Sequence, residues 1–205
     1  MRLGLLGGTF DPVHYGHLIL AECCREELQL DEVWFIPTGN PPHKVASGIS
    51  PGKHRCEMLE LATAGIPEFV VSRIEHDKTN TTYTVDTLQQ LVSEDPEREL
   101  FFIMGGDSLL DLKTWRQPDR IAELATIVAV NRGRDVLPGR KRLVSELGQT
   151  VVDRVQYVQV PAIDLSSSEI RQRVSSCMSI RFRVPRAVEV YIQENELYSN
   201  GSESD

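Results

Sequence analysis

The sequence has no run of apolar residues that approaches the ~20 needed to cross a membrane. The apolar run after Arg2 is broken by glycine within a few residues, so it lacks the apolar core of a secretory signal. These two absences argue against a membrane partner and predict a protein of the cytoplasm.

Cysteine is scarce: the 205 residues include four, namely Cys23, Cys24, Cys56 and Cys177. They form no CxxC pair, and no histidine-rich zinc pattern accompanies them. Two of them fall in a predicted helix, where buried free thiols are common. We expect reduced cysteines and no metal site built from protein side chains alone.

Basic residues are in deficit. Lysine and arginine number 22 against 30 aspartates and glutamates, which gives a net charge of -8. Proteins that bind nucleic acid through bulk electrostatics show a basic face, so we expect no nucleic-acid partner. A nucleotide substrate stays compatible with this charge, because a few local cations and helix ends suffice to bind phosphates.

The residues that are present suit one globular domain. The chain is 40% hydrophobic and 25% charged, and 205 residues can bury a sizeable core. We predict a single domain over residues 1–198 and a disordered polar tail at 199–205. The oligomeric state is left open, and a homo-oligomer is compatible with the sequence.

Short apolar runs alternate with helical patterns along the chain. The runs predict strands at 3–6, 32–36, 69–72, 100–104 and 125–130, with an alternating edge strand at 155–160. Continuous apolar strands between helices are typical of a parallel sheet covered on both faces. We therefore predict an α/β, Rossmann-like, doubly wound fold with a mainly parallel sheet. Ligands in such folds bind beyond the carboxyl ends of the strands.

Helical patterns separate these strands. They begin after residue 17, after Ser50-Pro51 with the serine as cap, at 85–92, at 118–124, and after Ser166 and Pro185. Residues 133–148 are basic and contain three glycines, so a loop with a poor helix is expected there.

The most informative stretch is GGTFDPVHYGH at residues 7–17, between the first strand and the first helix. Gly7 and Gly8 let the backbone approach a ligand, and the following helix points N–H groups and a positive dipole end at the turn. His14 and His17 are three residues apart, so one turn of helix brings them to the same face. This combination predicts a phosphate-binding site.

A second anion site is predicted at a later helix. Residues 166–169 match the capping box S-x-x-E, and Arg171 lies one turn into the helix that it opens. A guanidinium offers a forked donor that suits phosphate oxygens. On its own, this pattern is also explained by an ordinary helix cap followed by a solvated arginine.

Taken together, the motifs resemble those of the nicotinate-nucleotide adenylyltransferases in the HxGH nucleotidyltransferase superfamily. The matching segments stand in the family's order: GGTFDPVHYGH at 7–17, PPHK at 41–44, YTVDT at 83–87, Gly105-x-Asp107 followed by Trp115, and LSSSEIR at 165–171. Departures are small: Leu165 and Ser168 replace Ile and Thr, and Arg132-Gly133 stands where the family often has Arg-Pro-Gly.

The resemblance implies an enzyme of NAD biosynthesis that joins the adenylyl group of ATP to nicotinic acid mononucleotide, with Mg²⁺ arriving on ATP. It implies catalytic roles for His14, His17, Lys44 and Arg171. The implied ATP-binding set is Gly7, Gly8, Thr9, Phe10, both histidines, Gly105, Asp107, Ser167 and Arg171. Lys44, Thr84 and Trp115 are implied to bind the mononucleotide, with the indole stacked on the pyridine ring.

Several alternatives remain at this point. A pantetheine-phosphate or nicotinamide-mononucleotide adenylyltransferase, a class I aminoacyl-tRNA synthetase fragment and a non-catalytic nucleotide-binding module share parts of the pattern. Trp115 is equally well read as a core residue, and Thr84 as a helix cap. Asp11 is a candidate for bracing the turn through hydrogen bonds instead of touching substrate.

Overall fold

The computed structural model describes residues 1–39, 49–76, 82–132 and 139–199. Lys44 and the PPHK segment lie outside the described residues, as do positions 200–205 of the predicted tail. The side chain of Asp107 also falls outside what the structure describes. The predictions that rest on these groups are therefore not tested by the fold.

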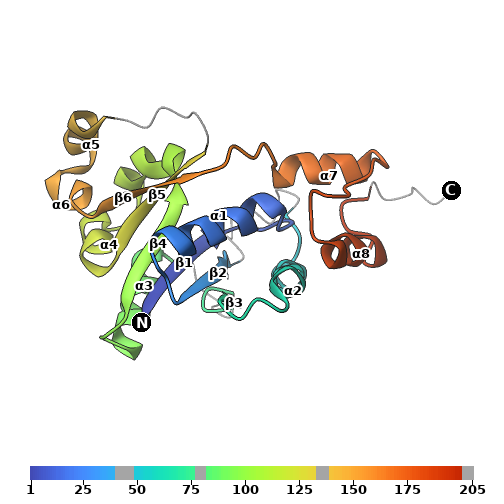
Figure 1. Cartoon of the computed structure of the whole chain (residues 1–205), viewed down its shortest axis with the longest axis horizontal. Helices are drawn as coiled ribbons and strands as arrows, with labels where there is room; N and C mark the ends of the chain where they lie inside the picture. The colour runs from blue at the N-terminus through green and yellow to red at the C-terminus, as the bar shows by residue number, and fades with distance from the viewer. Residues whose placement is uncertain (40–48, 77–81, 133–138, 200–205) are drawn as a thin grey trace.

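The strands of the described chain form one six-stranded sheet in the order β3-β2-β1-β4-β5-β6, and every neighbouring pair is parallel (Figure 1). The strands are β1 (Arg2–Gly8), β2 (Glu32–Pro37), β3 (Phe69–Val71), β4 (Glu99–Gly105), β5 (Thr126–Arg132) and β6 (Val155–Val160). The predicted fold class is confirmed, and the sheet is more uniform than expected, because all its strands run the same way. The predicted edge strand does lie at an edge.

Side chains alternate between two cores, one on each face of the sheet. In β1, Leu5 joins one buried cluster and Leu6 joins the other, because successive strand residues point to opposite faces. In β2, Phe35 and Ile36 divide in the same way. The apolar runs of the sequence thus reflect burial on both faces.

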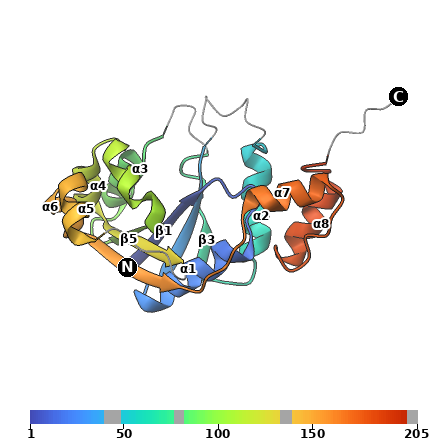
Figure 2. The same cartoon turned by 90° about the horizontal axis from the view of Figure 1, so that it is seen from above.

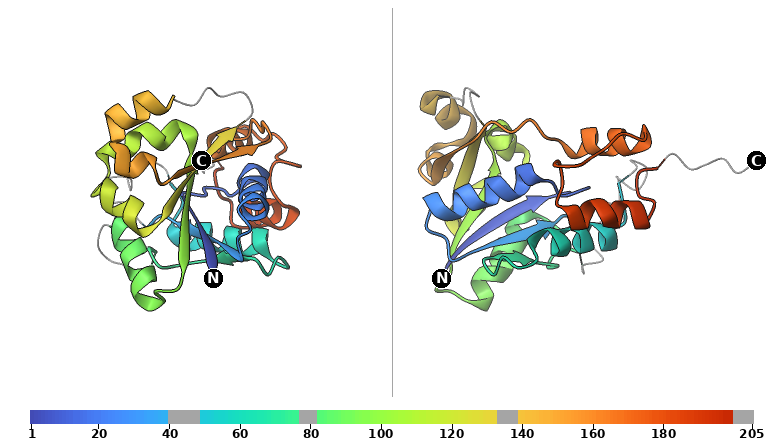
Figure 3. Two further views of the ribbon diagram at one scale, coloured as in Figure 1. Left: turned by 60° about the vertical axis from the view of Figure 1, so that its left-hand side comes forward. Right: turned by 45° about the vertical axis from the view of Figure 1, so that its right-hand side comes forward.

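Each face is covered by its own set of helices, as the left view of Figure 3 shows. One face carries α1 (Tyr15–Glu27), α2 (Gly52–Thr63), α7 (Ser167–Ser175) and α8 (Arg186–Glu194). The other carries α3 (Thr84–Glu94), the 3-10 helix η2 (Gly106–Thr114), α4 (Pro118–Leu124), α5 (Arg140–Leu147) and α6 (Gln149–Val152). The sheet is therefore doubly wound, as predicted.

The last two helices, α7 and α8, extend the molecule at one side, next to α2 (Figure 2). Ile170 of α7 and Val188 and Ile192 of α8 are buried in the same cluster as α1 and α2. The C-terminal segment therefore packs on the elements that flank the start of α1. One sheet organises residues 2–160, although the predicted domain bounds stay a prediction.

Two local expectations change. The cap of α2 is Pro51, with Gly52 as the first helical residue, so Ser50 is not the cap that the sequence predicted. The stretch 133–148, expected as a loop with a poor helix, contains α5 over eight residues, and the short α6 begins directly after it. Among the described residues, no helix is long and apolar enough to cross a membrane.

Candidate active site

The turn between β1 and α1 folds over the ring of Phe10. This residue has φ 50°, in the left-handed region, and only 2% of its surface is exposed. A Cβ on Gly8 would lie 2.9 Å from the Phe10 ring, so only glycine fits there without displacing that ring. The side chain of Phe10 is thus part of the core, and any contact with ATP would come from its backbone.

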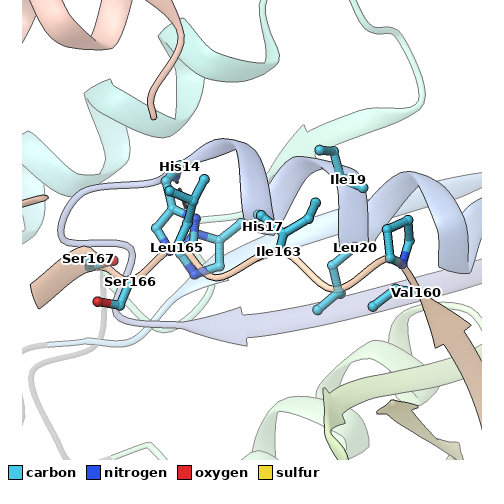
Figure 4. A pocket seen from close by; sticks show the side chains of 11 residues that line it. His14, His17, Ile19, Leu20, Val160, Ile163, Leu165, Ser166 and Ser167 are labelled. Carbon is cyan, nitrogen blue, oxygen red and sulfur yellow. Dashed lines mark hydrogen bonds between the residues drawn. The ribbon is translucent and has the colours of Figure 1, made fainter. Parts of the chain in front are cut away.

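The two histidines of the turn are stacked on each other, as Figure 4 shows. His14 is the cap of α1, and its ring centroid lies 3.7 Å from that of His17. The Nδ1 atom of His17 accepts the backbone N–H of His14 at 3.3 Å. A neutral imidazole that accepts at Nδ1 carries its proton on Nε2, so the His17 ring is a donor without needing a positive charge. Phe10 contacts His17 edge-on, with ring centroids 5.0 Å apart.

The N-terminus of α1 is less open than the sequence suggested. The backbone N–H of Tyr15 donates to the carbonyl of Arg183 at 3.0 Å, and that of His17 to the carbonyl of His14 at 2.9 Å. A Cβ on Gly16 would lie 3.0 Å from the ring of His14, so this glycine makes room for the imidazole. The helix end therefore contributes its histidine side chains more than a row of open N–H groups.

The second predicted anion site lies directly against this turn. Ser166 caps α7 by accepting the backbone N–H of Glu169 at 3.1 Å, which confirms the cap. Ser167 Oγ donates to the carbonyl of Pro12 at 2.8 Å, and Arg171 Nη1 donates to the carbonyl of Asp11 at 2.7 Å. Two segments more than 150 residues apart in sequence thus meet at one place.

A cavity of about 220 Å³, here called the histidine cavity, opens beside the stacked rings (Figure 4). His14, His17, Ser166 and Ser167 line its polar end. Its other end is apolar and follows α1, where Leu20 faces Ile163 of the segment after β6. Sequence reasoning missed this apolar wall, because the residues after an edge strand carry no pattern of their own.

A second cavity of about 200 Å³, here called the tryptophan cavity, lies at the carboxyl ends of β1 and β2. Gly7, Gly8, Thr9, Thr84 and Trp115 all line it. These five predicted residues come from the first turn, the start of α3 and the end of η2. The structure therefore brings them together as a single surface.

The aromatic wall of this cavity is held by packing. Trp115 is half-buried and contacts Phe102 edge-on, with ring centroids 5.7 Å apart. Thr84 is the first residue of α3, whose cap is Tyr83, so Thr84 is not the helix cap. Glu75 also lines the cavity, and its Oε1 atom accepts the hydroxyl of Thr87 at 2.9 Å. This carboxylate was not singled out from sequence, because a lone glutamate before a polar loop has no distinctive spacing.

The predicted ATP-binding residues do not all line the same cavity. His14, His17 and Ser167 line the histidine cavity, whereas the glycine turn lines the tryptophan cavity. The ring of Phe10 contacts both sides, since it lies under Gly8 and against His17. Gly105 ends β4 and lines neither of these two cavities, so its predicted contact with adenosine remains a prediction.

A buried anion supports the turn from below. Asp11 is 1% exposed, and its Oδ1 accepts the hydroxyl of Tyr198 at 2.6 Å. Its Oδ2 accepts the backbone N–H of Ser50 at 3.1 Å. The carboxylate therefore braces the turn, which is the alternative role that the sequence left open for it. Burial and the negative charge of Asp11 raise the pKa of Tyr198 above its usual range.

A buried cation lies next to it. Arg55 of α2 is 1% exposed and donates to three carbonyls: Thr9 at 2.9 Å, Thr38 at 2.8 Å and Ser50 at 3.2 Å. Burial lowers the pKa of Arg55, and the charge of Asp11 opposes that effect. Sequence analysis missed this residue, although a charge between the apolar positions of a predicted helix was a signal for it.

Comparison of the sequence with known proteins gives a consistent result. A sequence profile of the cytidylyltransferase-like family matches residues 5–173. The chain is 47% identical to a "Probable nicotinate-nucleotide adenylyltransferase" of Thermomicrobium roseum over 96% of this chain and 91% of the relative. It is 46% identical to a protein of the same name from Thermus thermophilus, over 97% of this chain and all of the relative.

Solved structures show the same fold at much lower identity. The nicotinic acid mononucleotide adenylyltransferase of Plasmodium falciparum, in a structure described as complexed with NaAD, superposes with a TM-score of 0.78 at 17% identity. The alignment covers 96% of this chain and 97% of the other. A structure of the same Plasmodium protein, described as complexed with APC, superposes with a TM-score of 0.76.

Proposed function

Because this chain belongs to the nicotinate-nucleotide adenylyltransferase family, within the cytidylyltransferase-like proteins, we propose that it joins the adenylyl group of ATP to nicotinic acid mononucleotide. The products are deamido-NAD and pyrophosphate. The observation that carries the proposal is the pair of unlike cavities on either side of one turn. A polar one is lined by His14 and His17, and an aromatic one by Trp115.

The reaction is a direct displacement at phosphorus. A phosphate oxygen of the mononucleotide attacks the α-phosphorus of ATP, and the bond from that phosphorus to the pyrophosphate oxygen breaks. Pyrophosphate leaves with the electron pair. Since the attacking group is already an anion, the protein has no need of a nucleophile or a strong base, and its part is alignment and charge stabilisation.

The histidine cavity suits the triphosphate and the adenine of ATP. We expect His14 and His17, which line this cavity, to stabilise charge on the α-phosphoryl group and the leaving pyrophosphate. Ser167, which lines the cavity, and Arg171, one turn further along α7, are expected to bind the outer phosphates. Arg171 uses one donor on the carbonyl of Asp11 and a second on Ser168 Oγ at 3.5 Å, and its fork carries further donors for phosphate oxygens. The apolar end near Ile163 offers a surface for a purine ring.

The tryptophan cavity suits the acceptor. The half-buried Trp115 has a surface in the cavity, which favours stacking on the pyridine ring over a purely structural role. Thr84 lines the same cavity, and we expect it to make a polar contact with the acceptor. Gly7, Gly8 and Thr9 border the same cavity, and backbone without bulky side chains allows the phosphate of the acceptor to approach the turn.

Mg²⁺ is proposed to arrive on ATP. No group of three or more histidines, cysteines, aspartates or glutamates that could hold a metal occurs among the described residues. Mg²⁺ is commonly bound through substrate phosphates and few carboxylates. The phosphates of an ATP molecule bound in the histidine cavity would provide such ligands. The metal would neutralise charge on the phosphates. Lys44 keeps its proposed phosphate role as an expectation from sequence.

The cytoplasm is the proposed compartment. None of the four cysteines, all of them among the described residues, forms a disulfide, and Cys23, Cys24 and Cys56 are at least half-buried. Such thiols suit a reducing environment, where ATP is also supplied.

The proposal is tested by offering the full chain ATP and Mg²⁺ with one of three acceptors and following pyrophosphate release. The acceptors are nicotinic acid mononucleotide, nicotinamide mononucleotide and phosphopantetheine. The highest kcat/KM is expected with the nicotinic acid form. A preference for phosphopantetheine would overturn the acceptor assignment, and nucleotide binding without pyrophosphate release would favour a non-catalytic module.

A further inference from the structure

Tyr198, close to the end of the described chain, reaches back to the first turn of the protein. Its hydroxyl donates to Oδ1 of Asp11 at 2.6 Å across 187 positions of sequence. The residue has φ 63°, a left-handed conformation that few non-glycine residues adopt, so local preference alone does not explain its placement. Its ring packs against the core cluster under α1 and α2.

Asp11 connects this hydroxyl to the histidine cavity. Its carboxylate accepts from Tyr198 on one oxygen and from the backbone of Ser50 on the other. Its own carbonyl accepts from Arg171 at 2.7 Å, and the carbonyl of the next residue accepts from Ser167 at 2.8 Å. The position of Asp11 therefore sets where two groups of α7 stand relative to the histidine turn.

We propose that Tyr198 is a positioning residue for adenylyl transfer. Its hydroxyl fixes the Asp11 carboxylate, and through it the carbonyls that orient Ser167 and Arg171. This inference rests on the proposed function, because it assigns the phosphates of ATP to those two side chains. Tyr198 is assigned no contact with substrate, since it lines neither cavity, and its connection to the histidine turn runs through Asp11.

A second tyrosine of the same segment makes a different connection. Tyr191 of α8 donates its hydroxyl to Glu57 of α2, and the same oxygen lies 2.7 Å from Nδ1 of His54. Neither partner lines the histidine or the tryptophan cavity. Both tyrosines thus anchor the C-terminal segment to the body of the protein, whereas the contact with the phosphate turn is made by Tyr198. Tyr191→Phe is therefore a matched control for Tyr198→Phe.

The tyrosine hydroxyls keep their protons under assay conditions. Burial, followed by the Glu57 carboxylate, raises the pKa of Tyr191 to about 12. Burial and the Asp11 carboxylate raise the pKa of Tyr198 as well. Each phenol is therefore a hydrogen-bond donor at neutral pH, and each Phe variant deletes one donor from the segment.

The experiment compares the full-length wild type, Tyr198→Phe and Tyr191→Phe in the pyrophosphate assay, well below the lowest melting temperature. For Tyr198→Phe we expect kcat/KM for ATP to fall about tenfold, the range for losing a hydrogen bond to a charged group. The KM for nicotinic acid mononucleotide should stay within about twofold, because the tryptophan cavity has no contact with Asp11. Tyr191→Phe should leave both constants within about twofold while lowering the melting temperature.

Three results would overturn the inference: unchanged kinetics for Tyr198→Phe, equal losses for both substrates, or an equal loss for Tyr191→Phe. Asp11→Asn provides a second variant if Tyr198→Phe does not fold, since it keeps an oxygen for Tyr198. Asp11→Asn should also lower kcat/KM for ATP. A change confined to the KM for nicotinic acid mononucleotide contradicts the proposal. In the double variant Tyr198→Phe/Asp11→Asn, fold-losses in kcat/KM for ATP that multiply would show that Tyr198 and Asp11 act separately.

Failure of the proposed function is distinguished by ATP binding measured calorimetrically on the same proteins. If the wild type releases no pyrophosphate with any acceptor, the function is wrong. The positioning role is then judged by whether Tyr198→Phe weakens ATP binding about tenfold and Tyr191→Phe does not.

Discussion

The two cavities rest on buried charges of opposite sign. In the turn that carries the histidines lies the buried Asp11 carboxylate, which accepts hydrogen bonds from Tyr198 and Ser50. Beside the tryptophan cavity lies the Arg55 guanidinium, which donates to the carbonyls of Thr9 and Thr38, both of them lining residues. An anion thus fixes the turn beside the phosphate-handling groups, and a cation fixes the backbone beside the aromatic wall.

The difference shows how each cavity holds its geometry. At the polar end of the histidine cavity, the side chains of His17, Ser166 and Ser167 are fixed by hydrogen bonds to backbone groups, so losing a single donor is expected to change catalysis. The tryptophan cavity is built from packed rings on a rigid backbone, so trimming a ring is expected to change affinity. Substitutions that separate kcat from KM therefore test the comparison.

The largest expected effect is on stability, from Arg55→Met. The change deletes a buried guanidinium and leaves the carbonyls of Thr9, Thr38 and Ser50 without their donor. We expect the free energy of unfolding, measured with urea, to fall by about 3 kcal/mol. Arg25→Met is the matched control, because the Arg25–Glu22 ion pair is partly exposed and is worth about 0.5 kcal/mol. Equal losses for the two variants would contradict the structural role of Arg55.

The next effect is on turnover. His17→Ala removes a donor from the histidine cavity and should lower kcat at least about a hundredfold, the range for a lost charge-stabilising donor. Circular dichroism should still report a folded protein, since the ring is half-buried and the core residue Phe10 remains. His54→Ala is the control, because that ring contacts Tyr191 and lines neither cavity. Near-normal turnover of His17→Ala would refute the role of His17.

A smaller effect should appear in acceptor affinity. Trp115→Ala removes the aromatic wall and should raise the KM for nicotinic acid mononucleotide about tenfold, with a smaller change in kcat. Trp115→Phe, which keeps a ring, should recover most of that affinity. An unaltered KM in the alanine variant would mean that Trp115 serves the core through Phe102 alone.

Part of the fold and of the candidate site could be predicted from the sequence. The strands and the doubly wound fold class could be predicted from the apolar runs. A strand that is buried on both faces is apolar along its whole length, and this can be seen in each strand by itself. The stacking of His14 on His17 follows from helical spacing, and the cap at Ser166 from its local sequence. Each of these features depends on neighbours within about one helical turn.

The missed features depend on partners that are distant in sequence. Tyr198 meets Asp11 across 187 positions, and Arg55 meets Thr9 across 46. No local pattern announces such pairs, because only the packing of α2 and α8 on one face brings them together. The sequence assigned the glycine turn to ATP, and that assignment stays a prediction. The feature it did not give is that Gly7, Gly8 and Thr9 line the same cavity as Trp115.

The smallest expected effect is on the pH dependence of stability, through the hydrogen bond between Tyr191 and Glu57. The hydroxyl of Tyr191 lowers the pKa of the Glu57 carboxyl, and the pKa of Tyr191 itself is raised to about 12. A lowered carboxyl pKa adds stability above its unfolded value of about 4.3, and this stability is lost as the pH falls through the folded pKa. A raised phenol pKa adds stability that is lost only as the pH rises from about 10 toward 12.

Tyr191→Phe should therefore cost at most about 1 kcal/mol between pH 5 and pH 9, because the pair is only partly buried. The difference from wild type should shrink when urea unfolding is repeated at pH values that fall below the ordinary carboxyl pKa of about 4.3, as Glu57 takes up a proton in the folded state. A difference that stays constant down to pH 3 would mean that the hydroxyl acts through His54 or through packing. In that case the carboxylate of Asp11 would be the one charged partner through which the C-terminal tyrosines act.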